Sequence, residues 1–350
     1  MPERKKRAGK KVSKAQGTRS KRVPKGKVSQ PSDQGTGESG GDRARRTRLG
    51  VSSSTRSVAL ESVARIRDLP RQAREAIQPE WDRFPYLSLV RAPVLPMKVP
   101  IMGPEITVAS YNVHRWTGLN GRARPEPERA TAVISEIEAD VIALQEVLRP
   151  SEAEDPLDVL CDGLGFHLAF APTRRHRRGE LGNAILSRYP MTSISVLDIS
   201  YSRIERRVAL AARFEGPGGG LGVVATHLSL VDRTRHRQVQ QLLEHPQLNA
   251  GPSVLIGDMN AWRQCKASQN LEDSLKQHNN FDWPATFPAA RPLLALDRIY
   301  ARKADVISIE SHDTRASRRA SDHLPVVARI QVSKDENDLR STSDPLAAHG

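Results

Sequence analysis

Most of the short apolar runs in this chain are followed at once by residues that can bind cations or transfer protons. These residues are Asn112, Glu146, His227, Asp258, Asn260 and Asp297, and the pair Asp322 and His323 precedes the last apolar run. Ligands in α/β folds collect outside the carboxyl ends of strands, so we expect these side chains to converge on one crevice. The set offers carboxylates, carboxamides and imidazoles without cysteine, which suits Mg²⁺ or Mn²⁺ and predicts a phosphate substrate.

Each of these residues, taken alone, has a simpler interpretation. Asp258 and Asn260 lie in a Gly-Asp-x-Asn turn of a kind common in loops, and Glu146 could merely end a strand. Their joint order along the chain favours a site instead. Clustered carboxylates repel one another unless a cation or a proton lies between them, so we expect bound metal to stabilise the fold.

Apolar runs that alternate with amphipathic segments indicate the elements that must position this set. The strand-like runs are 106–110, 141–144, 184–187, 208–214, 222–226, 254–256, 293–296 and 325–332. Helices are expected at 127–138, which opens with Pro127, and after Asp232, which can cap a second helix. The stretch 184–228 has no helical pattern. This arrangement predicts mixed sheets covered by helices rather than an all-parallel barrel.

Charge is distributed unevenly along the 350 residues. The chain carries a formal net charge of +14, and residues 1–50 hold 16 Lys and Arg against 4 Asp and Glu. That segment contains no aromatic residue, the first being Trp81, so it cannot bury enough apolar surface to offset the entropy of ordering. We expect a disordered basic arm joined to an almost neutral remainder.

Composition divides the chain into the arm 1–50, an adaptor 51–104, a folded domain 105–332 and a loose tail 333–350. In the adaptor we expect a short helix that ends at Pro70, and proline spacing predicts extended backbone over 84–102. No apolar run is long enough for a membrane span or a signal peptide. Cys161 and Cys265 are too few for a disulfide framework. A cytoplasmic location is therefore expected.

Seven motifs occur in a fixed order along 105–332: Ser-Tyr-Asn-Val-His, Leu-Gln-Glu-Val, Gly-Asn-Ala-Ile-Leu-Ser-Arg-Tyr-Pro, Ala-Thr-His-Leu, Gly-Asp-Met-Asn, Leu-Asp-Arg-Ile-Tyr and Ser-Asp-His-Leu-Pro-Val. In type and order they resemble the endonuclease/exonuclease/phosphatase superfamily, which has the deoxyribonuclease I-like fold. The resemblance implies a four-layer α/β/β/α sandwich, in which two packed mixed β-sheets are flanked by helices. Within the superfamily the chain looks most like small bacterial members of unknown substrate.

The resemblance also implies how the matched residues would hold metal and substrate. Asn112, Glu146 and Asp322 would bind the hydrolytic cation, Mg²⁺ or Mn²⁺. Asp258 and Asn260 would lie beneath the scissile phosphate, where they would orient the attacking water or, through Asp258, bind a second metal. Catalysis would then depend mainly on positioning and electrostatics.

The matched histidines would do the acid–base work. His323 would be the general base, with Asp297 accepting its other ring N–H and fixing its tautomer. His227 would bind a phosphate oxygen and assist the leaving alcohol. Abasic-site repair endonucleases of the superfamily usually lack a histidine at the position of His227. The presence of His227 therefore argues against a function in abasic-site repair. In deoxyribonuclease-like members a Glu orients this histidine, and Glu180, the one nearby candidate, is not assigned to that role.

Arginine-rich loops at 174–178, 203–207, 233–237 and 315–319 adjoin the motif-bearing strand ends. Beside an almost neutral domain they predict a positive field suited to a polyanion, although any single Arg could be ordinary surface decoration. Arg207 begins a strand and is the arginine expected to bind a phosphate. Trp262 could stack on a base or headgroup, or could wedge its loop against the core.

These features predict a divalent-metal-dependent phosphodiesterase that uses activated water, with nucleic acid as the preferred substrate. The basic arm would then tether nucleic acid with strong salt dependence; contact with an anionic membrane surface and a tail without a partner are the alternatives. A second interpretation is a phospholipid or sugar-phosphate phosphodiesterase or phosphatase, favoured by 84–102 and by His227. A third is a nucleic-acid-binding protein on a catalytic-type scaffold. The sequence indicates no oligomeric state.

Overall fold

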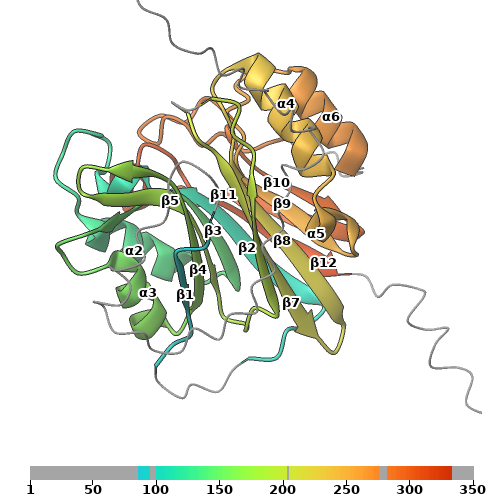
Figure 1. Cartoon of the computed structure of the whole chain (residues 1–350), viewed down its shortest axis with the longest axis horizontal. Coiled ribbons are helices and arrows are strands. Elements are labelled where there is room, and N and C mark those ends of the chain that lie inside the picture. Colours follow the sequence, from blue (N-terminus) through green and yellow to red (C-terminus); the bar gives the residue numbers. More distant parts are fainter. Residues whose placement is uncertain (1–85, 95–99, 203–204, 276–281, 333–350) are drawn as a thin grey trace, which may run out of the picture. The chain divides into compact units, whose positions relative to one another are not determined.

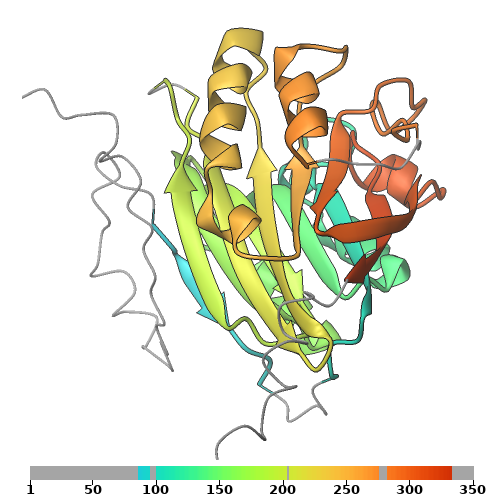
Figure 2. The same cartoon turned by 90° about the vertical axis from the view of Figure 1, so that its right-hand side faces the viewer.

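Two β-sheets lie face to face in the computed structural model, which describes residues 86–94, 100–202, 205–275 and 282–332 (Figure 1). Helices cover the outer face of each sheet, so that the layers run helix, sheet, sheet, helix (Figure 2). This confirms the predicted four-layer sandwich of two mixed sheets. The arm 1–50, the tail 333–350 and the short helix expected before Pro70 lie outside the described residues.

The first sheet has seven strands, and a single pair of them, β2 with β3, is parallel. In spatial order the strands are β1 (Leu89–Arg91), β4 (His167–His176), β5 (Gly179–Ser187), β3 (Val141–Pro150), β2 (Glu105–Asn112), β12 (Val326–Val332) and β11 (Ala304–Ser311). Strand β1 belongs to the adaptor 51–104 and pairs with β4 at the edge of the sheet.

The second sheet has five strands, and β8 with β9 is its one parallel pair. In spatial order they are β10 (Asp297–Arg302), β9 (Ser253–Asp258), β8 (Gly219–His227), β7 (Val208–Gly216) and β6 (Ser193–Asp198). In its described residues, the stretch from β5 to β8 runs through antiparallel strands without a helix, as expected from the missing helical pattern.

Alternate residues of the central strands face two different apolar layers. In β3, Val141 and Ala143 pack between the sheets, whereas Ile142 and Leu144 pack against the helices outside. Successive side chains of a strand point to opposite faces, so a strand buried on both faces reads as a continuous apolar run. This explains why the central strands could be predicted from short apolar runs.

The outer helices bury one apolar stripe each against a sheet. Helix α2 (Pro127–Ile137) and α3 (Pro156–Leu164) cover the first sheet, and α4 (Asp232–Leu243), α5 (Pro246–Asn249) and α6 (Lys266–Leu275) cover the second. Two short helices, η2 (His114–Trp116) and α7 (Ser317–Ala320), lie in loops. Both predicted helices are confirmed, although Val231 rather than Asp232 is the N-cap of α4.

The strand predicted at 293–296 is wrong. Leu294 forms an isolated bridge with Phe287, because the chain folds back on itself there, and the adjacent strand β10 starts only at Asp297. Backbone N–H groups of Thr286 and Phe287 both donate to the carbonyl of Leu294, so this segment forms a local turn instead of joining the sheet. Asp297 therefore opens a strand rather than following one.

The helices within the described ranges are all too short or too polar to cross a membrane.

Candidate active site

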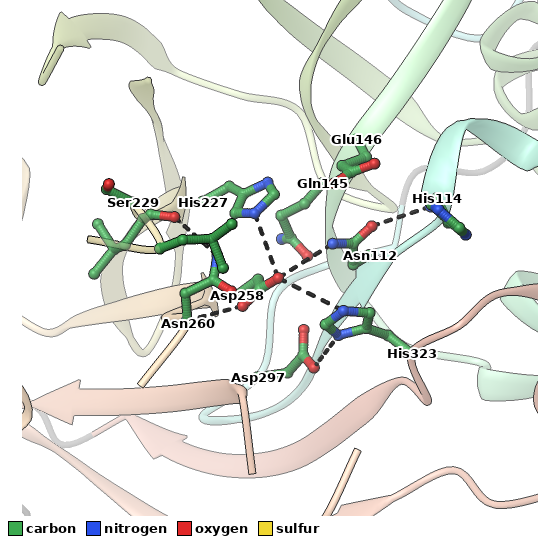
Figure 3. A network of polar contacts seen from close by, with 12 residues as sticks. Asn112, His114, Gln145, Glu146, His227, Ser229, Asp258, Asn260, Asp297 and His323 are labelled. Carbon is green, nitrogen blue, oxygen red and sulfur yellow. Dashed lines mark hydrogen bonds and ion pairs between the residues drawn. The ribbon is translucent and has the colours of Figure 1, made fainter. Parts of the chain in front are cut away.

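Most of the polar strand-end residues selected from the sequence lie close together in one network (Figure 3). In the parallel pair of the second sheet, His227 at the end of β8 stands opposite Asp258 at the end of β9. Asp297, which opens the antiparallel strand β10, also pairs with Asp258. In the first sheet the parallel pair β2 and β3 places Asn112 opposite Gln145, next to Glu146. Parallel strands end at the same edge, so the convergence follows from the topology.

Asp258 is the centre of this network and is almost fully buried. Its Oδ2 accepts from Nδ2 of Asn112 at 3.2 Å, and its Oδ1 accepts from the backbone N–H of Asn260 at 2.9 Å. Nε2 of His227 lies 3.4 Å and Nε2 of His323 lies 3.8 Å from the same Oδ2. Burial is the main reason that the pKa of Asp258 is raised to about 7.

His323 and Asp297 form a buried pair beside Asp258. Nδ1 of His323 lies 2.8 Å from Oδ2 of Asp297, and the same oxygen accepts from the hydroxyl of Thr286 at 2.6 Å. Burial disfavours a charged imidazole, but the carboxylates of Asp297 and Asp258 outweigh it and raise the pKa of His323 to about 10. The ring of Phe287 packs on that of His323 at 4.9 Å.

Glu146 and Asp322 lie on the more open side of the network, each side chain 26% exposed. Glu146 has φ +51° at a register shift between Leu144 and Val147. Such a bulge re-aims a side chain at a sheet edge. Oδ1 of Asp322 lies 3.2 Å from Nδ1 of His114. The pKa of Asp322 is raised, first by burial and also by the charge of Glu146.

These side chains fit a hard divalent cation. Glu146 and Asp322 offer carboxylate oxygens that repel each other, and Asn112 offers Oδ1, which accepts from the backbone N–H of His114 and keeps a second lone pair. Asp258, Asp297 and His323 form a second, tighter group, with ligand atoms within 4.8 Å of one another. In that group Oδ2 of Asp297 is already bonded to Thr286 and His323.

His227 is oriented by Arg207 instead of by a carboxylate. NH1 of Arg207 lies 3.3 Å from Nδ1 of His227, so the guanidinium donates and leaves the ring proton on Nε2, toward Asp258. Glu205 accepts from Arg207 at 3.1 Å. The pKa of His227 lies well below its ordinary value because of burial, Arg207 and His323. Glu180 bonds with Ser88 and Arg149 and does not contact His227.

Trp262 follows β9 and is 53% exposed. The guanidinium of Arg263 lies over its ring, with Cζ 4.9 Å from the ring centroid. Arg263 also donates to the carboxylate of Asp232 at 3.1 Å. The side chain is therefore presented to solvent beside the network and is not wedged into the core.

Sequence reasoning missed Thr286 and Glu205. Neither lies at the end of an apolar run: Thr286 belongs to the turn before β10, and Glu205 to the loop before β7. The ring of His114, another loop residue, contacts the carbonyl of Gly118 as well as Asp322. No pattern of spacing points to loop residues of this kind.

The sequence model of the Endonuclease/Exonuclease/phosphatase family matches residues 109–323, which include all of the network. The chain belongs to this family. Its members include nucleases, phosphodiesterases and phosphatases, and they are in general phosphoric-ester hydrolases that depend on divalent metal.

Relatives and solved structures agree with this assignment. Uncharacterized protein YbhP of Escherichia coli strain K12 is 33% identical over 247 residues, which cover 64% of this chain and 96% of YbhP. An endonuclease/exonuclease/phosphatase structure from Beutenbergia cavernae is 25% identical, with a TM-score of 0.51 over 65% of this chain and 72% of that one. The structure of D. rerio TDP2 complexed with a single-strand DNA product is 14% identical, with a TM-score of 0.50 over 65% of this chain and 98% of TDP2. This likeness shows the shared fold.

Proposed function

We propose that the protein is a divalent-metal-dependent phosphodiesterase that hydrolyses nucleic acid with an activated water molecule. The observation that carries this proposal is the buried pair of His323 and Asp297, which lies next to Asp258 and across from the more open carboxylates Glu146 and Asp322. A proton-accepting pair beside a cation-binding group is what hydrolysis of a phosphodiester requires.

His323 is the proposed general base. Its Nδ1–H donates to Asp297. A cation held by the neighbouring carboxylates would offset the negative charge that raises the pKa of His323, and Nε2 would then be free to accept the proton of the attacking water. Asp297 then stabilises the imidazolium that forms, and it holds the ring in this tautomer throughout. Nε2 points toward the carboxylate of Asp258. That carboxylate is held in place by the backbone N–H of Asn260 and by Nδ2 of Asn112, which both donate to it. The water would therefore be activated between His323 and Asp258.

The substrate phosphate would be held by donors around Asp258. The Nε2–H of His227 faces this region because Arg207 occupies the other ring nitrogen. Nδ2 of Asn112 also points there. A divalent cation bound by Asn112, Glu146 and Asp322 would polarise a phosphoryl oxygen and offset the charge that builds in the transition state.

Nucleic acid is the preferred substrate because the rim combines a stacking surface with cationic side chains. Trp262 is exposed, and Arg263 lies on its ring, an arrangement that suits a base beside a phosphate. Strong salt dependence would also be expected from the basic residues 1–50, which lie outside the described residues.

A phospholipid headgroup is the second candidate, for one reason. Leu230 and Val231, just beyond His227, are 67% and 56% exposed, and large apolar side chains at a rim suit contact with a lipid surface.

The test uses metal-stripped protein and supercoiled plasmid at low salt, with Mg²⁺ or Mn²⁺ added back. We expect metal-dependent nicking that is lost in His323→Ala. If plasmid stays intact but bis(p-nitrophenyl) phosphate or anionic vesicles containing phospholipid are hydrolysed, the substrate is a lipid or a small phosphodiester. If Asp258→Ala and His323→Ala leave every activity unchanged, the protein is a binding protein on this scaffold.

A further inference from the structure

A cavity of about 140 Å³ opens beside the network, on the side of Glu146 and His227. Its walls come from four places: Glu146 of β3, the strands β4 and β5, the loop before β7, and the end of β8. His227 belongs both to this wall and to the group around Asp258. His227 therefore lies between the cavity and the position proposed for the scissile phosphate.

The walls of this cavity carry an excess of positive charge. Arg174, Arg206 and Arg207 line it together with the carboxylates of Glu146 and Glu205. The carboxylate of Glu205 already has two partners, because it accepts from Arg207 and from the hydroxyl of Ser229, the latter at 2.6 Å. A cation held by Glu146 would neutralise that carboxylate and add to the positive potential in the cavity.

Further arginines surround the neighbouring hairpin between β4 and β5. Burial lowers the pKa of His176 at its tip, and the charges of the surrounding arginines Arg174, Arg115, Arg178 and Arg177 lower it further. Arg178 also donates to the carbonyl of Ala123, which fixes the hairpin against the loop after β2. Concave surfaces with one sign of charge concentrate ligands of the opposite sign.

Two of the groups that line the cavity, Arg207 and Asn183, are held in place before any ligand arrives. The backbone N–H of Arg207 donates to the hydroxyl of Ser200 at 2.9 Å, and its guanidinium spans His227 and Glu205. Asn183, buried in the same wall, donates to the carbonyl of Val208 at 3.1 Å. Nε of Arg207 is buried and has no hydrogen-bond partner among the described residues. A fixed cationic wall of this kind suits an anion of defined geometry.

We propose that this cavity binds a second phosphate group of the substrate, next to the phosphate that is cleaved. The inference rests on the proposed phosphodiesterase function and narrows it, because it requires a substrate that carries phosphates on neighbouring positions, as a nucleic-acid strand does. A substrate with one isolated phosphodiester would leave the cavity empty and would be bound more weakly.

The test compares two small substrates that differ by one phosphate: the p-nitrophenyl ester of thymidine 5′-phosphate with a free 3′-hydroxyl, and the same ester with a 3′-phosphate. We expect the KM of the wild-type protein to be about tenfold lower for the 3′-phosphorylated ester. Arg174→Ala should remove most of this preference, and Arg174→Lys should keep part of it. Arg329→Ala, which removes an exposed arginine paired with Glu105, is the matched control and should keep all of it.

A second measurement does not depend on turnover. Titration calorimetry with thymidine 3′,5′-bisphosphate and thymidine 5′-phosphate should show tighter binding of the bisphosphate to the wild-type protein, and an equal affinity for both in Arg174→Ala. Equal KM values and equal affinities in the wild-type protein would overturn the second phosphate site while leaving the hydrolase intact. Failure to hydrolyse either ester would count against the proposed function itself.

Discussion

Thr286 lies behind the proposed general base, in a turn that belongs to no helix or strand. It is fully buried, its hydroxyl donates to Asp297, and its carbonyl accepts from the backbone N–H of Leu324. Oδ1 of Asp297 has no hydrogen-bond partner in the described part of the chain, so Oδ2 carries the contacts of this carboxylate. Thr286 therefore sets the direction from which Asp297 meets His323.

The first prediction concerns this hydroxyl. Thr286→Val, which keeps the shape but removes the donor, should lower kcat about tenfold with little change in KM, since one hydrogen bond that orients the pair is lost. Thr286→Ser should restore kcat. Steady-state kinetics on one phosphodiester will distinguish these cases, and equal losses for both variants would show that packing matters rather than the hydroxyl.

The second prediction concerns the base itself. His323→Ala should lower kcat by about 10²–10⁴-fold, the usual contribution of general acid–base catalysis. His312→Ala is the control, because His312 contacts Glu136 on the outer surface and has no place in the network. A kcat for His323→Ala within a few-fold of the control would exclude His323 as the base.

The candidate residues at strand ends could be selected from the sequence because their positions depend on topology alone. A carboxylate such as Asp258 that directly follows a buried apolar run must lie at the sheet edge. Partners supplied by loops could not be selected in this way. Arg207 as the orienting group of His227 depends on how the loop before β7 folds, and periodicity carries no information on that.

Among the elements, α5 contains a pH-sensitive cap. The side chain of His245 accepts from the backbone N–H of Gln247 at 3.1 Å as the N-cap of this helix. Burial lowers the pKa of His245 to about 4. A protonated ring could not accept this bond, so the neutral form is the one that the folded protein keeps.

The third prediction follows from that shift. The folded pKa lies below the unfolded value near 6.5, so the stabilisation is complete above pH 6.5 and is lost as the pH falls toward 4. The full loss is roughly 3 kcal/mol. Urea unfolding at pH 7.5 and pH 4.5 should show this loss in the wild-type protein and a smaller one in His245→Asn, which keeps a cap acceptor without a titrating ring. Identical pH dependence in both proteins would rule out His245 as the cause.

Two of the strands that the sequence analysis did not predict in full have a weaker pattern. Strand β11, at the edge of the first sheet, has Val306 as its one buried residue, and β4 ends in Arg174, Arg175 and His176, so neither strand is apolar along its whole length. The apolar run at 293–296 was misleading for a different reason: Leu293 is exposed and Leu294 partly exposed in a turn, and Leu296 is its one buried leucine. Apolar runs indicate burial on both faces, and strands with one exposed face need cross-strand partners that are distant in sequence.

For the molecule as a whole, the carboxylates at the sheet edge should couple metal binding to folding. The fourth prediction is that Mg²⁺ or Mn²⁺ at about one hundred times its Kd raises the Tm by roughly 5–10 °C, which corresponds to about 2.7 kcal/mol. Thermal unfolding followed by circular dichroism measures this shift. Asp322→Asn and Glu146→Gln should each reduce it, and an unchanged shift in both would place the cation elsewhere.

Strand β1 has a consequence for how the chain can be shortened. It pairs with β4 along Leu89 to Arg91, and Arg91 forms ion pairs with Asp158 and Asp162 of α3. A chain that starts at residue 105 would leave the whole of β4 as an open edge, with N–H and C=O groups ready to pair with another copy. We expect that shortened chain to self-associate in size-exclusion chromatography, whereas a chain that starts at residue 82 should elute as the full-length protein does.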